Sequence, residues 1–319
     1  VIVFPRSYYA SASTIVNIGA IPVFADIDLN SQNITLQTIK KVYKKNKTKA
    51  ILCVHLGGYP CSMLEIKKFA KKNKIFVIED CAQAHGAMIK DGFVGSFGDV
   101  SAWSFCNDKI ISTGGEGGMI TTNSKKIFNF IWSYKDQGRN YNKFFSKKKS
   151  SNFIYLHDNI GSNFRLTEMQ SVLGIHQLKN LEKNIIKRNK IATKLDNCLK
   201  KYQAVRIVLK NKDIRNAYYR YYFFLNLEKI KIKQSRSKIL QYLKSKKIIC
   251  SVGSCAEIYN EKYFKNKKNY NISLKNAKII GKTSIAIHIN HLINTYELDY
   301  LCFHLDYIIN KVSATNEFD

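Results

Sequence analysis

The chain has 319 residues, of which 45% are hydrophobic, 12% are aromatic and only three are proline. This composition excludes a disordered or fibrous protein, and the length allows a large buried core divided between two lobes. Lysine and arginine number 52 against 23 acidic residues, for a formal net charge of +29, but only eight of the 52 are arginine. Nucleic-acid-binding proteins favour the flat, bidentate arginine side chain. We therefore interpret the lysine excess as general composition and keep a basic nucleic-acid-binding face as the alternative.

The eight cysteines form no C-x-x-C pair, and several lie in apolar runs where a reduced thiol packs as a small hydrophobic group. This usage predicts a reducing, cytoplasmic compartment. The sequence has no run of 18 apolar residues and no signal peptide, so no membrane association is expected. It opens at Val1 inside a strand-like pattern without an initiator methionine, and we expect an N-terminal segment to be missing.

Up to about residue 125, short β-branched or aromatic runs alternate with helical periodicity, which is typical of a mostly parallel α/β sheet. Between the third and fourth runs, Ser62 and Glu65 have the spacing of a capping box and predict a helix with Ile66 and Phe69 on its apolar face. The predicted strands of this first part cover residues 1–4, 22–26, 50–55, 75–79, 101–106 and 118–122.

A second capping box, Thr167 with Gln170, predicts the start of one long helix that extends toward about Leu199 and connects two lobes. Beyond it, mixed strands and helices predict a smaller α+β domain. Its strands are expected at residues 205–209, 219–227, 247–252 and 284–289, and a final helix at 297–312. We therefore expect a large domain of residues 1–185 and a small domain of residues 186–319. A loop is expected at 138–152.

Reactive side chains follow two successive strands of the predicted sheet. Asp80 ends an apolar strand, where it needs a cationic or donor partner, although a helix cap is an equal explanation. Lys109 follows the next strand, where partial burial would lower the pKa of its amine toward the neutral form that a nucleophile needs. Pyridoxal phosphate requires a lysine for a Schiff base and an acidic residue that keeps its ring nitrogen protonated. The pair could lie on opposite sides of one such ring.

Other motifs carry less information. The glycines at 114–118 favour a turn between strands over a phosphate-binding loop. His288 and His291 lie three residues apart on a strand-like run with no third ligand, so zinc is not expected. We interpret His55 and His85 as structural histidines rather than acid/base groups. The segment 161–166, before the long helix, is either a connecting loop or an anion contact near a helix N-terminus.

From Val1 to about Leu181 the sequence resembles the DegT/StrS family of pyridoxal-phosphate-dependent sugar aminotransferases, which have the aspartate aminotransferase fold, known as fold type I. A weaker similarity continues through residues 217–224 and 253–264. The matching strings, in order, are PRSYYASA (5–12), PVFADID (22–28), HLGGYP (55–60), EDCAQAHG (79–86), GSFGD (95–99), the stretch from Ser104 through Lys109 to Gly118, and NFRLTEMQ (163–170).

The resemblance implies specific roles for residues of the first domain. Lys109 would bind the cofactor as a Schiff base and move a proton between substrate and cofactor, and Asp80 would pair with the pyridinium nitrogen. Gln83 would lie at the cofactor's ring oxygen and Ser104 at its phosphate. Tyr8 would stack on the ring, which suits any flat aromatic face.

The resemblance further implies a homodimer with shared active sites, because Asn163 would reach the phosphate of the neighbouring subunit's cofactor. The family's glycine- and threonine-containing phosphate loop precedes the strand at which this chain begins. The implied activity is transfer of an amine from glutamate to a keto group on a nucleotide-linked sugar, for a surface polysaccharide or amino sugar. The alternatives are a non-catalytic truncated homologue, a basic nucleic-acid-binding protein, and a sugar dehydratase of the same family. Lys109 opposes the last, because those dehydratases carry His at that position.

Overall fold

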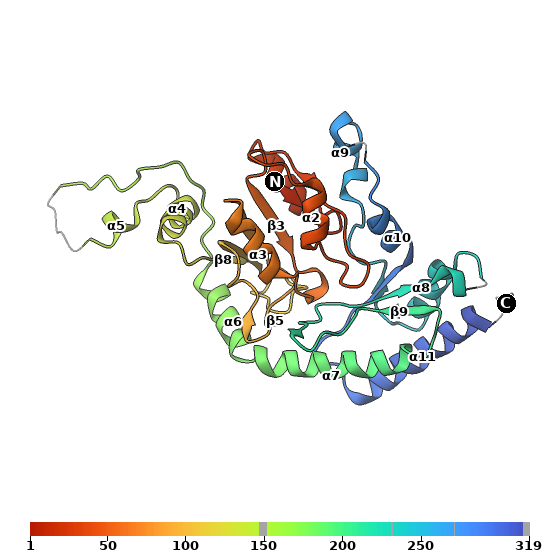
Figure 1. Ribbon diagram of the computed structural model, residues 1–319. Helices are drawn as coiled ribbons and strands as arrows, with labels where there is room; N and C mark the ends of the chain where they lie inside the picture. The colour runs from red at the N-terminus through yellow and green to blue at the C-terminus, as the bar shows by residue number, and fades with distance from the viewer. Residues whose placement is uncertain (147–151, 231, 271, 315–319) are drawn as a thin grey trace.

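The computed structural model describes residues 1–146, 152–230, 232–270 and 272–314 (Figure 1). Its first half contains a sheet of order β2-β1-β3-β4-β7-β8, in which all neighbours are parallel except β7 and β8. This arrangement agrees with the predicted mostly parallel α/β sheet. The strands are β1 (Ile2–Val3), β2 (Val23–Phe24), β3 (Ala50–Val54), β4 (Phe76–Asp80), β7 (Val100–Ser104) and β8 (Gly118–Thr121).

Helices α2 (Leu36–Val42) and α3 (Met63–Lys72) lie against one face of this sheet, and α1 (Ala10–Asn17) follows β1 (Figure 1). Apolar side chains of α2 and α3 form one buried core with the strands. The predicted capping box of α3 is wrong, because the Ser62 side chain makes no cap hydrogen bond. The backbone of Ser62 has ψ 63° instead of an extended value, and the Met63 N–H donates to the Cys61 carbonyl at 2.7 Å.

The predicted long connecting helix is two helices, α6 (Glu168–Lys179) and α7 (Leu181–Leu199). Its start is confirmed: the Thr167 hydroxyl accepts the Gln170 N–H, and the Gln170 side chain accepts the Thr167 N–H. The break lies at Asn180, whose side-chain amide donates to the His176 carbonyl at 3.0 Å. Beyond the break, α7 runs along the bottom of the molecule beneath both sheets (Figure 1).

The second half of the chain contains an antiparallel sheet of order β12-β13-β11-β9. Strands mixed with helices were predicted after residue 200, but their orientation was not. Leu195 of α7, Phe223 of the central strand and Leu305 of the last helix belong to its core. The strands are β9 (Val205–Ile207), β11 (Tyr221–Leu225), β12 (Cys250–Ser251) and β13 (Ser284–Ile287). The helices are α8 (Ser235–Ser245), α9 (Lys262–Lys265), α10 (Lys275–Thr283) and α11 (Thr295–Ala314), with 3-10 turns at Leu227–Lys229, Ile258–Asn260 and Lys268–Tyr270. A further 3-10 turn, Leu56–Gly58, follows β3 in the first half.

A small third sheet, which the sequence patterns did not predict, crosses the expected boundary at residue 185. Its strands β5 (Met88–Ile89) and β6 (Gly92–Phe93) form a hairpin, and β10 (Ile214–Arg215) pairs antiparallel with β5. The Arg215 side chain also donates to the Gly86 carbonyl at 3.0 Å. The two halves are therefore joined by backbone pairing as well as by α7.

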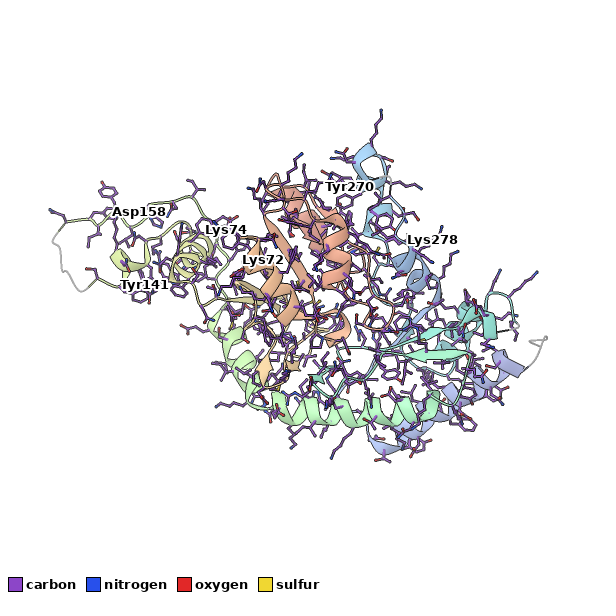
Figure 2. All side chains as sticks on the ribbon, in the orientation of Figure 1. Lys72, Lys74, Tyr141, Asp158, Tyr270 and Lys278 are labelled. Atoms are coloured by element: carbon purple, nitrogen blue, oxygen red, sulfur yellow. The ribbon has the colours of Figure 1, made fainter. Side chains whose placement is uncertain are left out.

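A pair of short helices, α4 (Lys125–Lys135) and α5 (Tyr141–Phe144), projects from the body (Figure 1). The loop expected at 138–152 is wrong over residues 141–144, which form α5, and residues 147–151 lie outside the described part of the chain. Lysines are spread over separate elements: Lys72 ends α3, Lys74 follows that helix, and Lys278 lies on α10 (Figure 2). All eight cysteines are free. Among the described residues, no helix is both long and apolar enough to cross a membrane.

Candidate active site

A cavity of about 1180 Å³ lies at the carboxyl ends of β4 and β7. Its floor is formed by the large sheet, and its opposite wall includes Tyr219, Arg220 and His288 from the second half of the chain. This edge of the sheet was the expected place for the site. Five of the six predicted site residues line the cavity: Tyr8, Asp80, Gln83, Ser104 and Lys109.

Asp80 ends β4 in a row of paired residues with Val54 on β3 and Ala102 on β7, and all three line the cavity. One carboxylate oxygen accepts the Ala82 N–H at 3.1 Å. Burial raises the pKa of Asp80, although that N–H, the positive charge of Lys109 and a hydrogen bond from the Ser11 side chain act in the other direction. No cationic side chain forms a salt bridge with Asp80 among the described residues. The carboxylate is therefore available to a protonated donor in the cavity.

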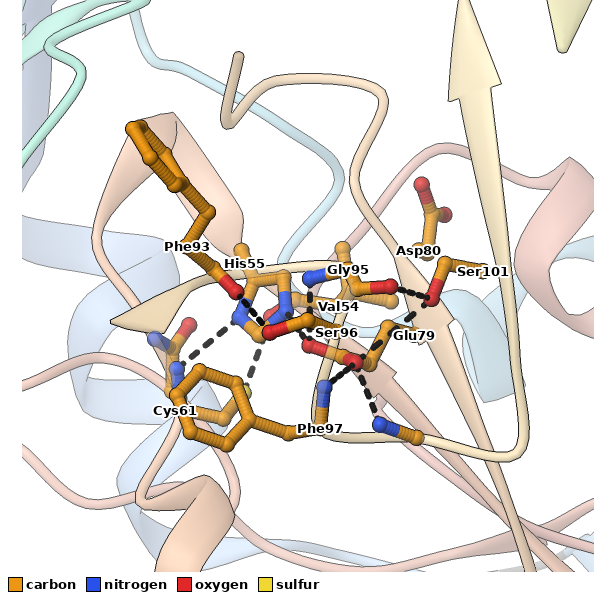
Figure 3. A network of polar contacts seen from close by, with 12 residues as sticks. Val54, His55, Cys61, Glu79, Asp80, Phe93, Gly95, Ser96, Phe97 and Ser101 are labelled. Carbon is orange, nitrogen blue, oxygen red and sulfur yellow. Dashed lines mark hydrogen bonds and ion pairs between the residues drawn. The ribbon is translucent and has the colours of Figure 1, made fainter. Parts of the chain in front are cut away.

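Glu79, the neighbour of Asp80, points to the opposite side of β4 and is fully buried (Figure 3). Its carboxylate accepts from the His55 ring at 3.0 Å and from the backbone N–H groups of Gly95 and Phe97, both at 2.9 Å, and of Gly98. The other His55 nitrogen accepts the Cys61 N–H at 3.0 Å. His55 thus has a structural place beneath the site. The Glu79 network fixes the strand end that carries Asp80.

The other predicted cofactor contacts approach the cavity from three elements. Gln83 accepts the Gly57 N–H at 2.7 Å through its side-chain oxygen, which leaves its amide NH₂ as the end that can donate to a ligand. The Ser104 hydroxyl, at the end of β7, accepts the Cys106 N–H at 3.3 Å and can donate its own proton. Tyr8, before α1, is 76% exposed at the cavity wall and offers a free aromatic face.

Lys109 lies on the turn after β7, where its backbone N–H donates to the Cys106 carbonyl at 3.0 Å. Its amine contacts Asp108 at 2.9 Å and the Tyr219 hydroxyl at 3.5 Å. The expected lowering of the lysine pKa is wrong. Burial acts in that direction, but the Asp108 carboxylate and Tyr219 outweigh it, so the pKa of Lys109 is raised.

Sequence reasoning missed the cavity wall that the second half of the chain provides. Arg220 contacts Asp108 at 3.3 Å. His288 was considered only as a metal ligand; burial and the nearby Arg220 charge lower its pKa to about 4. The one available signal was local: Asp108 adjoins Lys109, and Arg220 is an isolated cation in the aromatic run 218–224. Neither observation places these groups together without the fold.

Asn163 does not line the cavity. It forms an isolated bridge with Asp136 just before α6, and its side-chain oxygen accepts from the Arg165 guanidinium at 2.9 Å. His85 is also outside the cavity: it is buried against Trp103 and Phe105, and burial together with the Lys109 charge lowers its pKa to about 4. The structure thus separates one predicted site residue from the other five.

The donor set of the cavity fits pyridoxal phosphate. Asp80, which has no cationic partner among the described side chains, matches a protonated ring nitrogen. Lys109, on the turn after the adjacent strand, supplies a primary amine. Gln83 and Ser104 supply donors suited to a ring oxygen and a phosphate. These residues can hold the cofactor and position a proton-carrying amine beside it.

Comparisons with known proteins point the same way. The sequence profile of the DegT/DnrJ/EryC1/StrS aminotransferase family matches residues 1–306. GDP-perosamine synthase of Escherichia coli O157:H7 is 40% identical over 192 residues, which cover 60% of this chain and 50% of that protein. An aminotransferase from Psychrobacter cryohalolentis has a TM-score of 0.94 at 38% identity, over 98% of this chain and 81% of that one. Helicobacter pylori PseC, an aminotransferase involved in the biosynthesis of pseudoaminic acid, has a TM-score of 0.86 at 25% identity, over 97% and 79%. The chain thus spans about half the length of the GDP-perosamine synthase it matches.

Proposed function

The chain belongs to the DegT/DnrJ/EryC1/StrS aminotransferase family, a family of pyridoxal-phosphate-dependent sugar aminotransferases, and we propose that it transfers an amino group to the keto carbon of a nucleotide-linked sugar. One observation carries the proposal. A carboxylate without a cationic partner, Asp80, and the amine of Lys109 line one cavity at neighbouring strand ends. This combination is the minimum that the cofactor requires of a protein.

The bound cofactor supplies an electron sink that weakens bonds to the carbon bearing the amine. Asp80 would hold the proton on the ring nitrogen. Gln83 and Ser104 would donate to the ring oxygen and the phosphate, and Tyr8 would cover one face of the ring. The Lys109 amine would take a proton from the α-carbon of the amino donor and later deliver one to the sugar carbon.

We propose glutamate as the donor, which leaves as 2-oxoglutarate while its amine replaces the keto oxygen of the sugar. The product would enter a surface polysaccharide or amino sugar, and the reaction would take place in the cytoplasm. GDP-perosamine synthase, whose name contains a nucleotide and an amino sugar, supports this substrate class. The eight free cysteines are consistent with a reducing compartment.

We further propose that the active form is a homodimer that buries α6. This helix has no buried residue, although it carries apolar side chains on several sides. Met169, Val172 and Leu178 are 81%, 66% and 60% exposed. Such a helix needs an apolar partner surface, and a second copy would provide one. Asn163 lies five residues before the start of α6, and we propose that it lies near this interface and reaches the partner's cofactor.

The experiment is a titration of the protein with pyridoxal phosphate, followed by visible absorbance of the lysine-bound cofactor. The wild type and Lys72→Ala, an exposed lysine at the end of α3, are expected to develop the band, and Lys109→Ala is not. Glutamate alone should then abolish the band and yield 2-oxoglutarate, detected by mass spectrometry. Identical spectra for all three proteins would contradict the proposal. Salt-dependent retention on DNA would favour the nucleic-acid-binding alternative, and a product that loses a hydroxyl would favour the dehydratase.

A further inference from the structure

The carboxylate of Asp108 joins the predicted catalytic lysine to the wall from the second half of the chain. One oxygen contacts the Lys109 amine at 2.9 Å. The other accepts the Tyr219 hydroxyl and contacts the Arg220 guanidinium at 3.3 Å. Asp108 itself is exposed at the cavity, whereas the other three side chains are largely covered. A single carboxylate therefore accepts from two cations and a phenol.

The ring of Tyr219 lies next to both cations that contact the Asp108 carboxylate. Tyr219 is only 7% exposed. The Lys109 amine lies 5.0 Å from the centre of its ring, and the Arg220 guanidinium lies 4.4 Å from it. An aromatic face attracts both cations, and the hydroxyl at its edge directs the Asp108 carboxylate. The place of the lysine amine is thus defined by a ring, a hydroxyl and a carboxylate together.

We propose that Asp108 and Tyr219 are positioning residues: they hold the Lys109 amine at the cavity when it is not bonded to the cofactor, and they stabilise its ammonium form once it has taken up the substrate proton. The inference rests on the proposed function, in which this amine is alternately bonded and free. A free lysine side chain is flexible and loses rotamer entropy when it is held in one place. A fixed carboxylate and ring would keep the released amine at the cavity, with the proton that it must deliver.

The charges around Lys109 come from several elements. Asp80 acts on it from β4 and His85 from the segment after β4, and Asp108 and Tyr219 contact it directly. Glu116, Arg220 and His288 line the same cavity. Both histidines have lowered pKa values of about 4 and are neutral at pH 7. Arg220 is the cation among these groups, and it shares the Asp108 carboxylate, so Asp108 is the group whose removal should affect Lys109 most.

The test uses cofactor-free protein, limiting acetic anhydride at a series of pH values, and mass spectrometry of the acetylated lysines. Only the neutral amine reacts, so a lower pKa moves the Lys109 labelling curve to lower pH. We expect Asp108→Asn to increase Lys109 labelling at pH 8 by about tenfold for each unit by which the pKa falls. Lys67, paired with Asp99, serves as an internal reference in the same digest. Glu116→Gln removes a charge from the same cavity wall and should leave the Lys109 curve unchanged.

Tyr219→Phe keeps the ring and removes the hydroxyl, and it should move the Lys109 curve by less than Asp108→Asn does. It also provides a readout if Asp108→Asn does not fold. Curves that coincide with the wild type in both variants would overturn the proposal. The result is separable from the proposed function. If the Lys109 acetylation curves of the variants coincide with the wild-type curve while the wild type develops the cofactor absorbance band, only the positioning role is contradicted. If the curves shift but the wild type develops no band, only the proposed aminotransferase function is contradicted.

Discussion

Glutamine in place of Glu79 would test how the protein fixes the strand end that carries Asp80. The wild-type carboxylate accepts from His55 and from three backbone N–H groups in a fully buried place. The Glu79→Gln side chain keeps the size but turns one acceptor into an NH₂ group that opposes those donors. An unsatisfied buried donor costs about 1–3 kcal/mol, and bonds to a charged group are worth more than neutral ones. We expect a loss of about 3 kcal/mol from a total of roughly 5–15 kcal/mol.

The same substitution should change how the free energy of unfolding depends on pH under acidic conditions. Burial raises the pKa of Glu79, but the bonds from His55 and from the backbone N–H groups outweigh it, so the folded-state pKa is lowered. The stabilisation from this carboxylate is then fully present above the unfolded glutamate pKa of about 4.3, and it is lost as pH falls through the lower folded-state pKa. The Glu79→Gln variant lacks this group, so its stability should vary less with pH in that window.

The assay is urea unfolding followed by tryptophan fluorescence, with the unfolding free energy measured at several pH values between 3 and 7, a range set by the roughly 4.3 pKa of unfolded glutamate. Trp103 packs against Gly95, whose N–H donates to Glu79, so it reports on this region. Glu65→Gln, on the exposed first turn of α3, is the matched control and should change stability by less than about 0.5 kcal/mol. Equal midpoints and equal acid dependence in wild type and Glu79→Gln would refute the reasoning.

Three further predictions concern other parts of the molecule. Val172→Glu should convert the proposed dimer to a monomer in light-scattering measurements, since it places a charge on the exposed apolar surface of α6; an unchanged mass would contradict the interface. Gly253→Ala should lower the unfolding free energy by about 1–3 kcal/mol, because its Cβ would lie 2.4 Å from the Tyr222 ring at φ +90°. Gly115→Ala, with open space around it, should be close to neutral in the same denaturation series. Arg188→Met should cost about 2–4 kcal/mol, because two backbone carbonyls lose a buried donor; unfolding at the wild-type urea midpoint would exclude that role.

The strands of the first half could be predicted because their signals are local. Each is a short apolar run that ends at polar residues, and Asp80 and Lys109 follow two such runs that prove to be neighbours in the sheet. The polar wall of the cavity could not be predicted in the same way. Tyr219 and Arg220 are more than a hundred residues from Lys109, and tertiary packing alone brings them to Asp108. The raised pKa of Lys109 is a consequence of those contacts.

The helix boundaries are a second case in which local sequence signals did not determine the structure. Thr167 and Ser62 have similar sequence signals, but only Thr167 has the extended backbone that directs its hydroxyl to the first turn. At Asn180, which lies between α6 and α7, the backbone has φ −96° and ψ −3° and departs from regular helix values. In both cases a backbone angle decides between two structures that the side chains alone leave open.

The pairing of β10 with β5 sets an order of events during synthesis. The hairpin β5–β6 leaves the ribosome well before residues 214–215, so its outer edge has no partner while the intervening segment is made. An unpaired strand edge invites pairing with other chains. Nascent chains that stop before residue 214 should therefore aggregate more readily than those that extend past it. For the same reason, fragments 1–185 and 186–319 expressed separately should not both fold and stay in solution.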